Sequence, residues 1–370
     1  MNIRKKIIKL KILFKQNWFV FTVFIAWFFV NFLIFTLTGN LMEAILYTFY
    51  FSVRQDYYGH FYFTISGFVI FGWIVSLVTT ELYRKYYPEQ TCIALSRAMT
   101  SHTIIIGYSN LGKRIVKYLR RKQKRFVIIE DNRALVSDLI EGEEPVVPKK
   151  AHNIEVLSDA NVKKARLILN TKNDIETLVV ATDLIREVNK DCKIVCRCFD
   201  DSLAQILEKN LRCETISTSK YASERLFEKI KEVKAKNVLL IGCTNTTRRL
   251  MEQLKAERID YKIIEREREV VEDIIDEEPV IIGDAKDSDV LKEGGIASVD
   301  LVSILIDSAE EALLISDEVR ILNENCQLIC RFFHEEVAEI LEKAPFNAFV
   351  ISTSQHTLEK MIESGVFDGL

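Results

Sequence analysis

Two long apolar segments without a charged residue most constrain what this chain can fold into. They run from Trp18 to Leu37 and from Phe61 to Thr80, 20 residues each. At about 1.5 Å rise per residue, a helix of this length spans roughly 30 Å, the thickness of a bilayer's hydrocarbon core. A signal peptide is the alternative for the first segment, but the run is too long and no A-x-A-like site follows it. We therefore expect two membrane-spanning helices.

Basic residues on both flanks predict the orientation. The N-terminal tail carries six and no acid: Arg4, Lys5, Lys6, Lys9, Lys11 and Lys15. Arg84 and Lys85 follow the second apolar segment. Because cytoplasmic flanks are enriched in Lys and Arg, both ends should be cytoplasmic, in a multi-pass protein of the cell (plasma) membrane. All eight cysteines follow the apolar segments, so we expect reduced thiols and no structural disulfide.

A shorter apolar segment lies between the two long ones. Leu41–Val53 is compatible with a helix but too short to span a bilayer, so it should be re-entrant or interfacial. This layout resembles the pore of two-helix potassium channels, which implies a membrane α domain with a pore helix and a filter of backbone carbonyls. The resemblance places the pore and filter residues at Ser52, Val53, Arg54, Gln55, Asp56, Tyr57, Tyr58 and Gly59.

The filter segment departs from the family pattern. Ser52-Val53 can stand for Thr-Val, but Arg54–Gly59 replaces Gly-Tyr-Gly and contains one glycine, so left-handed backbone conformations are less accessible. Arg54 would repel a cation on the pore axis. Alternatively, Arg54 and Asp56 pair with each other or with neighbouring subunits, away from the axis. The second apolar segment also carries Gly67 and Gly72. The resemblance implies a gating hinge at these glycines, and close helix packing by small residues is the alternative, which is favoured for Gly67 and not separable from a hinge for Gly72.

The rest of the chain consists of two copies of one sequence pattern. Six segments recur in order, nearly all at an offset of 134 or 135. The matched pairs are His102–Gly107 with Asn237–Gly242, Phe126–Glu130 with Tyr261–Glu265, Ser158–Ala160 with Gly283–Ala285, Cys192–Arg197 with Cys326–Arg331, Ala204–Lys209 with Ala338–Lys343, and Ile216–Ser219 with Ile351–Ser354. We therefore expect a transmembrane domain at 1–100 and two repeats at 101–235 and 236–370.

Each repeat alternates short β-branched strands with amphipathic helices, which predicts an α/β Rossmann-like domain with a parallel sheet. In the first repeat a loop between strand and helix resembles the G-x-G-x-x-G phosphate-binding pattern, with Gly107, Ser109, Asn110 and Gly112. Glu130 and Asp131 follow the second strand, where a ribose-binding acid belongs. The equivalent loop of the second repeat, Gly242–Thr247, lacks two of the three glycines. We therefore expect the second repeat to be a packing partner of the first or to bind a different ligand.

The second repeat carries a more specific resemblance. Gly283-Asp-Ala followed by Leu291 and Gly294-Gly-Ile296 is similar to the regulator of potassium conductance (RCK, TrkA-N) family. The resemblance implies a homotetramer with a cytoplasmic ring of eight such domains around one pore. It also implies NAD(H) or an adenine nucleotide as regulatory ligand, calcium as a possible one, and a place for Asp159 in the ligand crevice, by analogy with the G-D-A position.

Other function classes find less support. A net charge of -3 indicates no nucleic acid partner. Neither the Cys192–Cys198 nor the Cys326–Cys330 spacing is that of a zinc site, so no metal site is expected there. We predict a ligand-gated channel for a monovalent cation, potassium, and no enzyme. The alternatives are a non-conducting nucleotide sensor anchored in the bilayer and an NAD-dependent membrane oxidoreductase, which the fold permits but no acid–base pair supports.

Overall fold

The structure is a computed structural model that describes residues 14, 17–86, 88–199, 201–332 and 339–369. The six basic residues of the N-terminal tail, Arg4 to Lys15, lie outside the described residues. The chain divides into two compact units. Residues 1–100, 130–149 and 155–161 form the first, and residues 101–129, 150–154 and 162–370 form the second.

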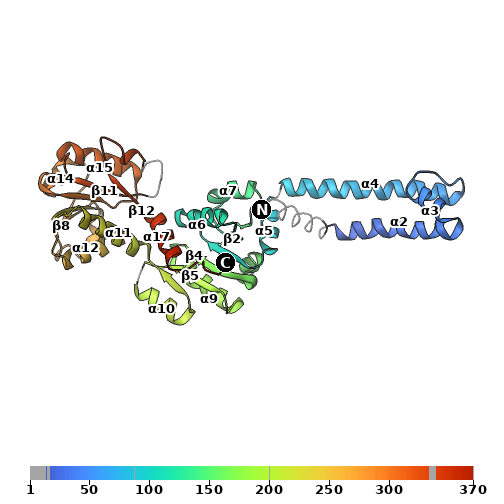
Figure 1. Ribbon diagram of the computed structural model, residues 1–370, viewed down its shortest axis with the longest axis horizontal. Coiled ribbons are helices and arrows are strands. Elements are labelled where there is room, and N and C mark those ends of the chain that lie inside the picture. Colours follow the sequence, from blue (N-terminus) through green and yellow to red (C-terminus); the bar gives the residue numbers. More distant parts are fainter. Residues whose placement is uncertain (1–13, 15–16, 87, 200, 333–338, 370) are drawn as a thin grey trace. The chain divides into compact units, whose positions relative to one another are not determined.

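Two helices of the first unit are long and apolar enough to cross a membrane. They are α2 (Trp18–Thr38) and the first 24 residues, Tyr57–Thr80, of α4 (Tyr57–Tyr86). In each, only 11% of the most apolar stretch is buried. Exposed rings such as Phe19 at 66% and Phe68 at 70% would be unfavourable in water, whereas lipid or a neighbouring chain would cover them. The two helices lie side by side and are joined through α3 (Leu41–Thr48) (Figure 1).

Polar side chains connect α2 and α4 along their length. Trp27 Nε1 donates to Ser66 Oγ at 2.7 Å, and Tyr58 Oη donates to Asn31 Oδ1 at 2.5 Å. Such bonds between apolar helices fix the rotation of each helix about its axis. The short helix α3 ends at Thr48, whose carbonyl accepts a 2.8 Å bond from Tyr62 Oη. The predicted helix over 41–53 is therefore shorter than its apolar pattern suggested.

A linker helix follows α4 in the chain. It is α5 (Pro88–Arg97), and its first residue is a proline, which suits the first helical position because no hydrogen-bonded N–H is lost there. The buried face of α5 packs on α7 (Arg133–Glu141) and β3 (Val146–Val147). Cys92 lies in this contact, with its thiol donating to the Ile140 carbonyl at 3.7 Å.

The first repeat forms a six-stranded sheet in the order β3-β2-β1-β4-β5-β6. Its strands are β1 (His102–Ile106), β2 (Phe126–Ile129), β3, β4 (Ala165–Asn170), β5 (Lys193–Arg197) and β6 (Glu214–Ile216). The helices are α6 (Asn110–Arg121), α7, α8 (Ile154–Asp159), α9 (Ile175–Val188), α10 (Asp201–Leu211) and α11 (Thr218–Glu232), with a short 3-10 turn η1 (Val162–Lys164). The buried strand β1 pairs in parallel with β2 and β4, so the carboxyl ends of these strands share one edge.

The second repeat has the same strand order, β12-β11-β10-β7-β8-β9 read from the other end. Its strands are β7 (Asn237–Ile241), β8 (Asp260–Glu265), β9 (Val280–Ile282), β10 (Leu301–Ile304), β11 (Gln327–Phe332) and β12 (Phe349–Ser352). The helices are α12 (Asn245–Ala256), α13 (Arg268–Val271), α14 (Ser288–Glu293), α15 (Ala309–Leu322) and α17 (Thr353–Glu363), with a turn η2 (Ile296–Ser298). The predicted pair of parallel α/β domains is confirmed.

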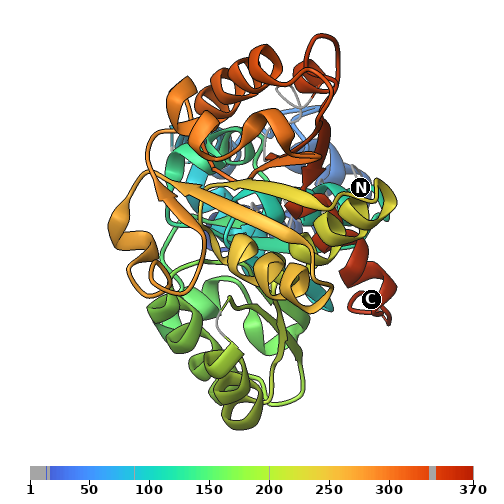
Figure 2. The same cartoon turned by 90° about the vertical axis from the view of Figure 1, so that its left-hand side faces the viewer.

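Alternating side chains of strand β7 in the second sheet are buried on opposite faces of that sheet. Leu239 and Ile241 pack with α15, whereas Val238 and Leu240 pack with α11 and α12. Figure 2 shows helices of this repeat above and below the orange strands. Two buried faces explain why these strands read as continuous apolar runs.

The structure corrects one match within the repeat. Helices α8 and α14 are equivalent at an offset of 134, as are η1 and η2. At that offset Gly283-Asp284-Ala285 corresponds to Lys149-Lys150-Ala151, and both alanines are buried. Ser158-Asp159-Ala160 instead lies at the end of α8. A three-residue pattern recurs by chance, whereas strand and helix positions are set by packing over the whole domain.

Candidate functional site

The loop between β1 and α6 is a tight turn that depends on two glycines. Gly107 has φ +99°, and a Cβ there would lie 2.8 Å from Thr171 Oγ1. A Cβ on Gly112 would lie 2.2 Å from the Gly107 carbonyl oxygen. Thr171 Oγ1 in turn donates to the Gly107 carbonyl at 3.0 Å. The turn therefore has the close backbone approach that a phosphate-binding loop requires.

Ser109 and Asn110 lie where this loop enters α6. Ser109 is the N-cap residue of the 12-residue helix and makes no side-chain capping bond, and Asn110 is its first helical residue. The first-turn N–H groups carry partial positive charge, which favours an anion at this end. The arrangement suits a phosphate, and phosphate binding by these residues stays a prediction.

Glu130 and Asp131 follow directly after β2. Glu130 is 2% exposed; its Oε1 accepts from Asn132 N at 3.0 Å and its own N–H donates to the Val147 carbonyl at 3.2 Å. Asp131 is exposed. Asn132 caps α7 by accepting from Ala134 N at 3.1 Å, so these bonds hold the β2–α7 turn in shape. The ribose-binding roles of Glu130 and Asp131 stay predictions.

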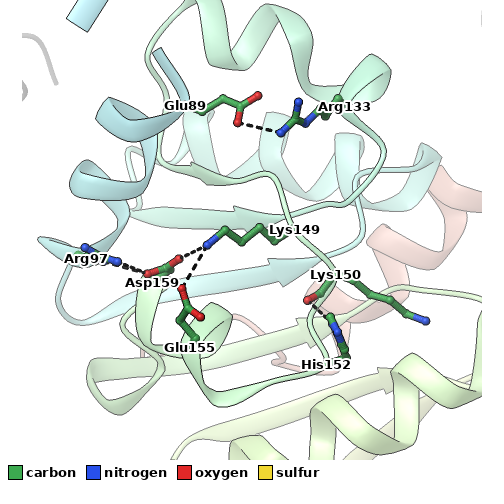
Figure 3. Close-up of polar contacts among 8 residues, drawn as sticks. All are labelled: Glu89, Arg97, Arg133, Lys149, Lys150, His152, Glu155 and Asp159. Atoms are coloured by element: carbon green, nitrogen blue, oxygen red, sulfur yellow. Dashed lines mark hydrogen bonds and ion pairs between the residues drawn. The ribbon is translucent and has the colours of Figure 1, made fainter. Parts of the chain in front are cut away.

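Asp159 does not occupy the G-D-A position from which its ligand role was predicted. It is 1% exposed and lies between two cations, as Figure 3 shows. Its Oδ1 accepts from Arg97 Nε at 2.9 Å and Nη2 at 2.5 Å, and its Oδ2 accepts from Lys149 Nζ at 3.1 Å. The hydrogen bond to Asp159 raises the pKa of Lys149. Both carboxylate oxygens are thus occupied by the chain's own cations, one of them from the linker helix α5.

Arg97 and Lys149 were missed by the sequence analysis. Arg97 is the last residue of α5, where the helix dipole favours a cation, so its charge gives no separate signal of function. The signal for Lys149-Lys150 lies in the repeat itself, because at a constant offset of 134 these two lysines replace the Gly283-Asp284 of the second repeat. Lys150 Nζ lies 3.8 Å from Asp174 Oδ2 and 3.7 Å from Glu176 Oε2.

The corresponding turn of the second repeat is filled by its own side chains. Thr247 stands where the first repeat has Gly112, and its hydroxyl donates to the Gly242 carbonyl at 2.6 Å. Glu265, the counterpart of Glu130, accepts from Cys243 N at 2.6 Å. The threonine and the carboxylate occupy donors and space that a pyrophosphate would use, which favours the packing-partner interpretation.

The second half of the predicted filter lies within a helix. Tyr57, Tyr58 and Gly59 lie in the first turn of α4, where Gly59 N donates to Asp56 Oδ1 at 2.7 Å. Only Ser52–Asp56 remains outside the helices for a filter after the turn that ends α3. Arg54 pairs with Asp56 at 2.7 Å and donates to Thr38 Oγ1 at 2.6 Å. The predicted pairing of Arg54 with Asp56 is present, and its position away from a pore axis stays a prediction.

The predicted hinge glycines lie within continuous helix. A Cβ at Gly67 or Gly72 would meet no atom within 4 Å, so no contact inside this chain requires glycine there. Both are exposed on α4. Packing by these glycines would need a second chain, and their hinge role stays a prediction.

Among the described residues no group of three or more His, Cys, Asp or Glu side chains could hold a metal ion. All eight cysteines are buried. Burial raises the pKa of the Cys192 and Cys326 thiols and raises the pKa of Cys330 to about 12, which keeps them protonated near neutral pH. These thiols are components of the two cores.

Comparison with known families matches the TrkA-N domain twice, at residues 103–218 and 238–352. Solved structures with the same fold include the GsuK channel, at 16% identity and TM-score 0.71 over 98% of this chain and 100% of that chain. The GsuK channel bound to ADP matches at 16% identity and TM-score 0.70, over 97% of this chain and 99% of that chain. The GsuK channel bound to NAD matches at 13% identity and TM-score 0.68, over 97% of this chain and 85% of that chain.

Two curated relatives match part of the sequence. Potassium channel protein 1 of Methanocaldococcus jannaschii is 24% identical over 128 residues, which are 34% of this chain and 38% of that protein. An uncharacterised protein of Methanothermus fervidus is 25% identical over 150 residues, 39% of this chain and 23% of that protein. The matches therefore span well under half of these relatives.

Proposed function

Because this chain belongs to the TrkA-N domain family, we propose that its tandem TrkA-N domains regulate a cation channel, for potassium, in the cell membrane. The observation that carries the proposal is the order of parts. Two membrane-length helices enclose a short third one, and a ten-residue linker helix joins them to two TrkA-N domains. GsuK, a channel, shares this fold over its whole length.

The exposed helix faces support the proposal of a tetrameric assembly. One chain has two spanning helices and leaves most of their apolar surface uncovered, so four chains around one axis would enclose a pore and bury part of that surface. Both ends of each chain would lie in the cytoplasm, in agreement with the basic flanks. The TrkA-N domains would form a ring beneath the pore.

The regulatory ligand is an adenine nucleotide, NAD(H) or ADP. Gly107, Ser109, Asn110 and Gly112 would bind its phosphates, and Glu130, with Asp131 beside it, would accept from ribose hydroxyls. Two of the structural neighbours are GsuK bound to ADP and GsuK bound to NAD, which supports this ligand class. Calcium as a second ligand stays a prediction, and the described part of the chain contains no cluster of side chains that could hold it.

Coupling from ligand to pore would pass through α5. This helix packs on α7 and β3, which border the proposed ribose site, and Arg97 holds Asp159 at its end. A nucleotide that binds one ring conformation better than another shifts the equilibrium of α4 by that difference in affinity.

The test is potassium or thallium flux into liposomes that contain the purified protein, with and without NAD(H), ADP, ATP and calcium. Ligand-dependent flux supports the proposal. Intact tetramers that bind nucleotide and pass no ion would contradict it. That outcome would favour the second candidate, a non-conducting nucleotide sensor, for which the Arg54–Asp56 pair and the shortened filter are the specific observations. NADH turnover above background would instead indicate an oxidoreductase.

A further inference from the structure

Two arginines at equivalent places of the repeat line one cavity. Arg197 ends β5, and Arg331 lies near the end of β11. Both occur in the recurring Ile-Val-Cys-Arg and Leu-Ile-Cys-Arg segments, which the nucleotide site does not use. Arg331 is 9% exposed. Buried guanidinium groups need anionic or hydrogen-bonding partners, so their surroundings indicate what the cavity binds.

The cavity has a volume of about 200 Å³ and is lined by both TrkA-N domains. Three pairs of equivalent residues contribute: Asn173 with Asp307, Arg197 with Arg331, and Thr218 with Thr353. The start of α12, Thr244–Thr246, closes it. Among the described residues, the lining contains one aromatic side chain, Phe199. The Cζ atom of Arg197 lies over its ring, 4.6 Å from the ring centroid. A cavity so lined suits a small polar ligand.

Charge is not balanced between the two halves of the cavity. Arg331 Nη2 donates to the carboxylate of Asp307, which is 73% exposed. Arg197 Nη1 donates to the amide oxygen of Asn173 at 2.8 Å, and Nε and Nη2 donate to Thr218 Oγ1 at 3.3 and 3.1 Å. An amide therefore replaces the acid in the first repeat. Two guanidinium groups and one carboxylate leave the lining with an excess positive charge.

The two cations also affect each other. Burial, and then the charge of Arg331, lower the pKa of Arg197 to about 10, and burial lowers the pKa of Arg331. Both guanidinium groups stay charged at neutral pH, so the cavity keeps two like charges near each other, one buried at Arg331 and one half-buried at Arg197. A bound anion would offset their desolvation and their mutual repulsion.

We propose that this cavity binds a small phosphate-type oxyanion between Arg197 and Arg331. The planar guanidinium forks match the oxygens of a phosphoryl group in a way that a lysine does not, and the hydroxyls of Thr218 and Thr353 supply further donors. The cavity volume lies below the roughly 300–1,000 Å³ of sites for drug-sized ligands, so it favours a small anion over a whole dinucleotide. The anion is either free phosphate or the phosphoryl group of a small metabolite. Since both domains line the cavity, the anion links them.

The test is thermal unfolding and calorimetric titration of the full-length protein in detergent, with sodium phosphate against sodium chloride of equal ionic strength. We expect phosphate to raise the Tm of the wild type saturably. Arg197→Met and Arg331→Met should each weaken phosphate binding by roughly tenfold or more, because a charge-assisted hydrogen bond is lost. Arg225→Met is the matched control and should leave the affinity unchanged, because Arg225 lies on α11 outside the cavity lining and pairs with Glu228.

Two further arms separate the site from the nucleotide loop and from misfolding. Gly112→Ala should weaken the response to ADP and leave the response to phosphate. Arg197→Lys keeps the charge without the fork and should bind phosphate more weakly than wild type if Arg197→Met does not fold. A response to glycerol 3-phosphate that Arg197→Met abolishes, without one to phosphate, assigns the site to a metabolite. Phosphate and glycerol 3-phosphate affinities within about twofold of wild type in both Arg→Met variants, or no response of the wild type to either, would overturn the proposal.

Discussion

Arg97 and Asp159 stand 62 residues apart in the chain and form a forked ion pair in which Arg97 Nε and Nη2 both donate to Asp159 Oδ1. Asp159 is 1% exposed, whereas the Arg97 side chain is 61% exposed. The buried partner is thus in the TrkA-N domain, and the exposed one is on the helix that follows α4. In the proposed channel, this pair would connect a change in the domain to the helix that follows α4.

Asp159→Asn should uncouple ligand from flux. The variant removes the negative charge that Arg97 and Lys149 share and should cost about 1.5–3 kcal/mol in unfolding free energy, the range for a hydrogen bond to a charged group. Nucleotide affinity should stay near wild type, while the ligand-dependent change in liposome flux falls. Asp284→Asn is the control, because the Asp284 side chain in the second repeat is 41% exposed and pairs with Lys286. Equal loss of coupling in both variants would contradict this role for the Arg97 pair.

Gly112→Ala should weaken nucleotide binding. Its Cβ would lie 2.2 Å from the Gly107 carbonyl oxygen, so the loop must open and the phosphate donors move apart. We expect at least a roughly tenfold weaker affinity for ADP or NAD by calorimetry. Thr247→Ala changes the equivalent position of the second repeat, where a side chain is already accommodated. An ADP affinity that falls in Thr247→Ala and not in Gly112→Ala would move the site to the second repeat.

Asp56 should stabilise the start of α4 by two separable interactions. Asp56→Ala removes both the acceptor for Gly59 N and the partner of Arg54, and should destabilise the protein by about 0.5–2 kcal/mol, as for a lost helix cap. Asp56→Asn keeps an acceptor oxygen and loses the ion pair, so it should cost less, about 0–1 kcal/mol. Thermal unfolding in detergent measures both. Equal losses in Asp56→Asn and Asp56→Ala would show that the charge of Asp56, and not its role as a helix cap, stabilises this end of α4.

The Asp201–Arg249 contact between the two TrkA-N domains should weaken in acid. Arg249 Nη2 donates to Asp201 Oδ1 at 2.8 Å, and this hydrogen bond lowers the pKa of Asp201 below its usual 3.8. Because the folded pKa is the lower one, the stabilisation is present above the unfolded value and is lost as the pH falls through the folded value.

We therefore expect the Tm difference between wild type and Asp201→Asn to be constant from about pH 7 to about pH 5 and to shrink below about pH 4. The amide introduced by Asp201→Asn cannot titrate, so this variant provides the baseline against which the step is read. A difference that grows on acidification would contradict the assignment.

Much of the fold could be predicted because its signals are local. Apolar runs such as Trp18–Leu37 exceed what a soluble core helix needs, and the alternation of short strands and amphipathic helices recurs at a nearly constant offset. The tight turn at Gly107 and Gly112 was recognised for the same reason, since the conformational demand falls on the residues of the turn itself. The orientation predicted from the basic flanks and the reduced state predicted for the cysteines likewise depend on sequence position alone, and not on contacts with distant residues.

What the sequence by itself determined, then, is the set of elements: two membrane-length helices, two parallel α/β domains and one glycine turn. The tertiary structure decided which distant residues meet. It placed Asp159 against Arg97 rather than at the G-D-A position, ended α3 at Thr48, and brought Arg197 and Arg331 to one cavity. Short motifs and single charges carry too little pattern to specify a partner. Their contacts follow from strand register and helix packing, which depend on the burial of many side chains at once.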